Sequence, residues 1–236
     1  WNFCCKGVYE MKDILRPIVE LSVVLPGLLL AYFPVKSYLK QSPGKLAARI
    51  LHLMAGLCIG GGIVCYQLHA STASALAGIT LLAIGLYTGT LQISLWKSGT
   101  IALTVCAVFA CINSLSRAIS AAIALHMQLP QDEPWFCLAA CVFYNVVCWI
   151  LVLAAFYPST HAVRVMVEDD NFAQTWYVFW VLPLVFIFLN LFMIPRYQTT
   201  LRTGRVLQGY IVISIALLLL LLWFNAIFLL MASSLN

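Results

Sequence analysis

Long apolar stretches dominate this chain and constrain its fold more than any other feature. Each is long enough to cross a bilayer, which takes about 20 predominantly apolar residues in a helix. Only 9% of the residues are charged, against about 25% in ordinary soluble domains. We therefore expect a multi-pass membrane protein. The expected spans are Ile14–Pro34, Ala47–His69, Ser74–Leu95, Gly99–His126, Pro134–Pro158, Gln174–Pro195 and Val206–Met231.

These spans are expected to be helices. Backbone groups in lipid must be hydrogen-bonded internally, and the chain lacks the alternating segments of about 10 residues that mark a membrane β-barrel. We predict an all-α fold, a polytopic transmembrane bundle of about seven helices that forms one domain over residues 1–236. The breaks at residues 69–73 and 96–98 are short, so they predict tight helix hairpins.

Basic residues bear on orientation, because cytoplasmic loops carry an excess of Lys and Arg. The total count does not decide, since the two sides hold equal numbers. The basic loop Val35–Leu46, close to the first span, and the acidic loop at Asp132 and Glu133 favour an outside N-terminus and an inside C-terminus.

On this topology a cationic loop between the last two spans lies outside, against the general rule. It is a candidate site for an anionic ligand or for lipid head groups. The alternatives are that the orientation is the opposite one, or that the loop simply rests on lipid phosphates. Its residues of interest are Arg196, Tyr197, Arg202 and Arg205.

Glycine pairs predict where helices pack closely. Gly56 and Gly60 form a GxxxG pattern in the second span, extended by Gly61 and Gly62, and Gly85 and Gly89 form another in the third. Small residues of this kind let helix backbones approach each other in lipid. We expect the two patterns to pack spans two and three together; a homodimer interface is the alternative.

Glu20 and Arg117 are the ionisable residues that stand out inside the spans, where charges are costly and indicate function. With the N-terminus outside, a rise of 1.5 Å per residue puts Glu20 about 9 Å and Arg117 about 13 Å below the same surface. Other polar side chains fall in this layer. They are Asn113, Tyr144, Asn145 and Asn190.

Two interpretations of this layer remain open. Glu20 and Arg117 form a structural ion pair in one, and in the other they line a ligand pocket that opens to the outside.

Other kinds of chemistry are not indicated. The chain has no Walker, HExxH or GxSxG motif, so we expect neither catalysis nor a cofactor. Cys137, Cys141 and Cys148 share one helical face but have no His at ligand spacing, which favours packing over a metal site. The net charge of +5 comes from residues that flank spans, so we expect a lipid bilayer as the partner and no nucleic acid.

The last third of the chain carries a resemblance. Phe156-Tyr157-Pro158 is followed by an acidic linker, Trp176, Leu182-Pro183-Leu184, Ile194-Pro195-Arg196-Tyr197 and a strongly apolar last span. This pattern resembles the membrane sensor half of GHKL-type sensor histidine kinases from Gram-positive bacteria, a group that includes quorum-sensing peptide receptors. The resemblance implies a bacterial cytoplasmic membrane and a cytoplasmic coiled coil and kinase domain after Asn236. This chain itself has no phosphorylatable-His helix and no ATP-binding lobe.

The sequence therefore predicts a sensor or receptor domain. It would detect an extracellular or membrane-borne small molecule or peptide and signal through its last span to a cytoplasmic output domain, with a homodimer expected if the kinase resemblance holds. A small transporter or channel is the first alternative, although His52, Gln67, Gln92 and Asn225 offer only a sparse polar path. A structural or assembly subunit is the second.

Overall fold

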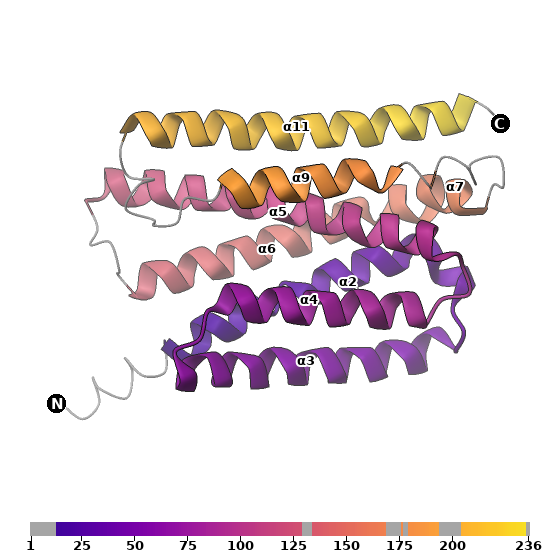
Figure 1. Ribbon diagram of the computed structural model, residues 1–236, viewed down its shortest axis with the longest axis horizontal. Helices are drawn as coiled ribbons and strands as arrows, with labels where there is room; N and C mark the ends of the chain where they lie inside the picture. Colours follow the sequence, from indigo (N-terminus) through magenta and orange to yellow (C-terminus); the bar gives the residue numbers. More distant parts are fainter. Residues whose placement is uncertain (1–12, 129–133, 169–175, 177–178, 194–203, 235–236) are drawn as a thin grey trace.

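Helices make up nearly all of the described chain. The computed structural model describes residues 13–128, 134–168, 176, 179–193 and 204–234. Within them, strand-like pairing is limited to one isolated bridge between Leu39 and Leu91. The helices in Figure 1 are residues 13–21, α2 (Val24–Tyr32), the 3-10 helix η1 (Phe33–Tyr38), α3 (Pro43–Leu68), α4 (Thr72–Gly89), α5 (Leu95–His126), α6 (Pro134–Pro158), the π-helix η2 (Ser159–Val163), α7 (Arg164–Glu168), α9 (Val181–Met193) and α11 (Gly204–Ser234).

Five helical segments of the described chain are long and apolar enough to cross a membrane. They are Asp13–Tyr38, Pro43–Leu68, Thr72–Gly89, Leu95–His126 and Trp135–His161. The predicted all-helical, multi-pass architecture is thus confirmed. The predicted count of seven is not, because in place of the last two spans the described residues hold the shorter apolar stretches Val181–Asn190 and Leu207–Trp223.

The two short turns between spans differ in how well they were predicted. The α3–α4 turn falls at residues 69–71, where His69 adopts a left-handed conformation with φ of 49° and the Ala70 N–H donates to the Cys65 carbonyl at 3.0 Å. The break predicted at residues 96–98 is wrong, since those residues form the first turn of α5. Ser94 is the N-cap and accepts a hydrogen bond from the Lys97 N–H at 3.4 Å, a role for which serine is favoured.

Backbone hydrogen bonds join two loops at one end of the bundle. The Lys40 N–H donates to the Thr90 carbonyl at 3.0 Å, and the Gln92 N–H donates to the Tyr38 carbonyl at 2.9 Å. The Lys40 ammonium adds a bond to the Gly89 carbonyl at 2.8 Å. The segment after η1 is therefore fixed to the turn between α4 and α5.

The first span is broken in its middle. Pro26 has no N–H to give to the Ser22 carbonyl, so the helix stops at residue 21 and resumes at Val24, as expected for an interior proline. Asn145 of α6 reaches across to this break, where its Nδ2 donates to the Val19 carbonyl at 2.6 Å. The Ser22 hydroxyl lies 2.8 Å from the same carbonyl oxygen. Polar side chains thus satisfy a carbonyl that the regular helix would have bonded.

The predicted GxxxG glycines do not pack spans two and three together within the described chain. At the extension of the first pattern, a Cβ on Gly61 would lie 3.3 Å from the side chains of Ile79 in α4 and of Leu21. A Cβ built on Gly56, Gly60, Gly85 or Gly89 would meet nothing within 4 Å. The close approach is made instead by Gly62, where a Cβ would lie 3.0 Å from both the Cα and the N of Ile18. A glycine of α3 does approach another helix closely, as the pattern predicts. The helix it approaches is residues 13–21, and the contact is made by Gly62, on a different face of α3 from Gly56 and Gly60.

α5 lies at the centre of the bundle. It packs against α2, α4, α6, α9 and α11, and Figure 1 shows it running beside α9, with α11 on the far side. The apolar window of α5 is 50% buried, against 17% for that of α4. α5 therefore contacts helices on several sides of the bundle along its length.

Candidate functional site

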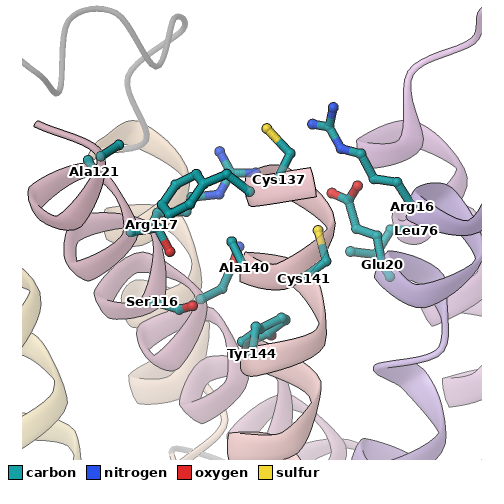
Figure 2. Close-up of a pocket in the computed structure, with 14 residues that line it drawn as sticks. Arg16, Glu20, Leu76, Ser116, Arg117, Ala121, Cys137, Ala140, Cys141 and Tyr144 are labelled. Atoms are coloured by element: carbon teal, nitrogen blue, oxygen red, sulfur yellow. The ribbon is translucent and has the colours of Figure 1, made fainter. Parts of the chain in front are cut away.

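A cavity of about 110 Å³ lies at the end of the bundle where residues 13–21 begin, α5 ends and α6 begins. We call it the charged cavity. Figure 2 shows its walls, with residues 13–21 on one side, α5 on the other and α6 between them. Its lining residues are Arg16, Glu20, Leu76, Asn113, Ser116, Arg117, Ser120, Ala121, Ala124, Phe136, Cys137, Ala140, Cys141 and Tyr144.

Three charged side chains reach this small space, and none of them forms an ion pair with another described residue. Glu20 and Arg117 stand on opposite walls in Figure 2. Within the described residues the sole ion pair is Arg164–Glu168, far along the chain. The structural pair of Glu20 and Arg117, one of the two interpretations of the sequence, is therefore not formed. Arg16 brings a second guanidinium to the cavity, so its lining carries a formal charge of +1.

The Glu20 carboxylate has a local partner. Its Oε2 accepts a hydrogen bond from the Thr72 hydroxyl, at 3.0 Å, across the interface with α4. That bond uses one of the several lone pairs that a carboxylate offers. Glu20 therefore keeps acceptor capacity that can be turned toward the cavity.

Four of the six predicted pocket residues line the charged cavity: Glu20, Asn113, Arg117 and Tyr144. The Tyr144 hydroxyl donates to the Phe109 carbonyl at 3.1 Å. The hydroxyl proton is therefore engaged within the protein, and the aromatic ring is the part of Tyr144 that can contact a ligand. The other two predicted residues lie elsewhere. Asn145 follows Tyr144 and is turned by about 100° from it on the helix, and Asn190 belongs to α9, of which no described residue lines the cavity.

Asn145 and Asn190 have structural partners. Asn145, one position after Tyr144, satisfies the break in the first span. Asn190 of α9 is 1% exposed; its Oδ1 accepts from the Ser114 hydroxyl at 2.7 Å, and its Nδ2 donates to the Phe186 carbonyl at 2.8 Å. This amide therefore fixes α9 against α5 and does not contribute to the charged cavity.

We expect Asn190→Leu to destabilise the bundle by about 1–2 kcal/mol, because it leaves the Ser114 hydroxyl unpaired at a buried helix interface. A double-mutant cycle with Ser114→Ala, read from thermal unfolding in detergent, should give a coupling of about 0.6 kcal/mol or more. Asn225→Leu is the matched control, since the described contact of its Nδ2 is to the Leu221 carbonyl of its own helix. Equal losses of unfolding free energy in the two asparagine variants would contradict a stabilising contact of Asn190 between α9 and α5.

Arg16, Cys137 and Cys141 are the lining residues with ionisable groups that sequence reasoning missed or assigned otherwise. Arg16 lies one helical turn before Glu20, a spacing that already places both on one face. Cys137 and Cys141 were assigned to packing, yet both line the cavity. Cys148, on the same predicted face, is instead fully buried in an apolar cluster. Among the described residues, no group of three or more His, Cys, Asp or Glu could hold a metal ion.

The predicted cationic loop falls largely outside the described residues. Arg196, Tyr197 and Arg202 lie in the segment 194–203, which the structure does not describe. Arg205 belongs to the first turn of α11. The role of this loop as an anion or lipid site stays a prediction.

Comparison of the chain with protein-family models, with curated proteins and with solved structures finds no match to any of them.

Proposed function

We propose that this chain is the membrane domain of a sensor or receptor whose ligand binds in the charged cavity. The observation that carries the proposal is the set of three charged side chains that share a small cavity without pairing to one another. Charges are expensive inside a bilayer and are retained where they serve a function. A ligand that neutralises them would repay part of that cost on binding.

The lining charges define the class of ligand. Two guanidinium groups favour a carboxylate or phosphate, which arginine recognises through paired N–H donors. The single carboxylate of Glu20 favours an ammonium or hydroxyl donor on the same molecule. The ligand is therefore a small anion or a zwitterion, and a cavity of about 110 Å³ would enclose such a head group more readily than a folded peptide.

The domain spans the bacterial cytoplasmic membrane seven times in this proposal, with α9 and α11 as the sixth and seventh spans. Its N-terminus is outside and its C-terminus inside, so the charged cavity opens to the exterior. A homodimer and a histidine kinase output domain are part of the same proposal and rest on the resemblance of the last third of the chain.

α5 offers the route for the signal. It supplies Asn113, Ser116 and Arg117 to the cavity and packs along α11 over much of its length. A ligand that draws Arg117 toward Glu20 would therefore shift α5 relative to residues 13–21. α11, as the last span, would pass that shift to the cytoplasmic side.

The test is a binding screen on the protein in nanodiscs. Small carboxylates, phosphates and zwitterionic amino acids are scored by the rise in melting temperature. A binder should lose its effect in Glu20→Gln/Arg117→Met but keep it in Arg49→Met, which removes an exposed arginine of α3.

Two results would overturn the proposal. A binder that stabilises a folded Glu20→Gln/Arg117→Met variant as well as the parent would remove the charged cavity as its site. Transport of the binder into sealed proteoliposomes would show that the protein is a transporter and not a sensor.

A further inference from the structure

The two walls of the charged cavity carry different charges. Arg16 and Glu20 extend into it from residues 13–21, and Arg117 faces them from α5 (Figure 2). Arg16 is exposed, whereas Glu20 and Arg117 are half-buried. One wall therefore presents a cation and an anion side by side, and the other presents a cation alone.

The two charges on residues 13–21 match a zwitterion. Arg16 and Glu20 are four residues apart, and side chains at this spacing are neighbours on a helix surface, with Cβ atoms about 5–6 Å apart. Within the described chain they form no ion pair with each other, so each can pair with an opposite charge on a ligand. An ammonium and a carboxylate on one carbon atom would satisfy both at once. That arrangement is the head group of an α-amino acid.

The α5 wall is rich in hydrogen-bond donors around Arg117. Asn113, Ser116 and Ser120 also line the cavity, and offsets of three, four and seven residues from Asn113 put all four side chains on one face of the helix. None of the four side chains forms a hydrogen bond with another described residue. All four can donate hydrogen bonds. This wall therefore suits a carboxylate, which only accepts them.

The charge balance selects among small anions. The lining carries two positive charges and one negative charge. A phosphate or a simple dicarboxylate would bring only negative charge to the Glu20 carboxylate, and a neutral amino acid would leave one guanidinium without a partner. Uncompensated charge is costly inside a bilayer. A ligand with two carboxylates and one ammonium complements all three groups and leaves the occupied cavity neutral.

Building on the proposed function, we infer that the ligand of the charged cavity is an acidic α-amino acid. Its ammonium pairs with Glu20, and its α-carboxylate pairs with Arg16. Its side-chain carboxylate crosses the cavity to Arg117 and to the donors beside it on α5. Such a ligand contacts residues 13–21 and α5 at once, so it links the two helices that the proposed signal moves relative to each other.

The test is equilibrium binding of radiolabelled L-glutamate and L-aspartate to the protein in nanodiscs, measured by scintillation proximity. We expect saturable binding of at least one of them. Unlabelled competitors of the same length each lack one group: L-glutamine or L-asparagine lacks the second carboxylate, and glutarate or succinate lacks the ammonium. Each should compete about tenfold or more weakly than the acidic amino acid, because each has lost one hydrogen-bonded charge pair.

Single substitutions assign each group of the ligand to its partner. Arg117→Met should remove the preference for the acidic amino acid over its amide, and Glu20→Gln should remove the preference over the diacid that lacks the ammonium. Arg49→Met changes an exposed arginine of α3 and should retain both preferences. Each preference is a ratio measured within one variant, so a general loss of affinity does not imitate the expected change. Retention of both preferences in Arg117→Met and Glu20→Gln would place the ligand outside the charged cavity.

Three results with the parent protein alone would contradict an acidic amino acid as the ligand. They are the absence of saturable binding to the folded protein, equal competition by the amide, and equal competition by the diacid. The proposed function is tested separately. It stands when a different small anion stabilises the parent and loses its effect in Glu20→Gln/Arg117→Met, and it fails when no binder depends on these two side chains.

Discussion

Arg117→Glu is expected to reverse the charge preference of reagents that enter the charged cavity. Cys137 and Cys141 line that cavity beside Arg16 and Arg117, so their thiols report on what enters it. A negatively charged methanethiosulfonate should modify them faster than a positively charged one, once each rate is divided by its rate with a free thiol.

The expected effect is large because the charges are close and partly shielded from water. Two unit charges about 8 Å apart interact by about 2 kcal/mol at an effective dielectric constant of about 20, and salt screens the part that faces solvent. Removing the positive charge in Arg117→Met should therefore lower the anion-to-cation rate ratio by about tenfold. Arg117→Glu changes the local charge by two units and should lower the ratio by about a hundredfold.

The background and the control make the measurement specific. Cys58, Cys65, Cys111 and Cys148 are buried, and Cys4, Cys5 and the half-buried Cys106 are replaced by serine. Labelling should disappear in Cys137→Ser/Cys141→Ser. In Arg49→Met the ratio of the anionic to the cationic labelling rate should be unchanged. A ratio that does not respond to Arg117→Glu would show that this guanidinium does not govern entry to the cavity, whatever the ligand is.

Depth along the bundle could be predicted from sequence, and direction around each helix could not. Counting residues from the span ends places Glu20, Asn113 and Arg117 in one layer, and these three line one cavity. The same count includes Asn145, which turns away to bond the Val19 carbonyl. Depth follows from the fixed rise of a helix, whereas direction depends on which neighbours each helix has, and every span here is apolar on most of its surface.

The broken first span shows the same limit. Pro26 predicts a kink, because an interior proline removes a hydrogen bond. It does not predict that Asn145 of α6 will donate to the Val19 carbonyl at the break, since that contact joins residues 126 positions apart. The helix boundaries near Ser94 were missed for a different reason. Leu95 and Trp96 are apolar and extend the hydropathy signal across a turn.

Gly62→Leu is expected to disrupt the bundle, while Gly60→Leu is expected to be tolerated. A Cβ on Gly62 meets backbone atoms of Ile18 at 3.0 Å, and backbone cannot move aside as a side-chain tip can. Overpacking of this kind costs about 1–3 kcal/mol even where neighbours give way, and Leu adds three more carbons. Gly60 lies on the same helix with nothing within 4 Å of an added Cβ, so it tests the effect of a leucine alone.

A substitution at Gly62 should also change the charged cavity, because the helical residues 13–21, which pack against Gly62, carry Arg16 and Glu20. We expect Gly62→Leu to lower the midpoint of thermal unfolding, followed by fluorescence-detected size exclusion, by several degrees or more relative to Gly60→Leu. The milder Gly62→Ala should remain folded yet alter the rate at which Cys141 is modified, since residues 13–21 must move away from α3. Unchanged stability in Gly62→Leu would mean that α3 does not pack on residues 13–21 at this point, and the wall that presents Glu20 would then lack its support.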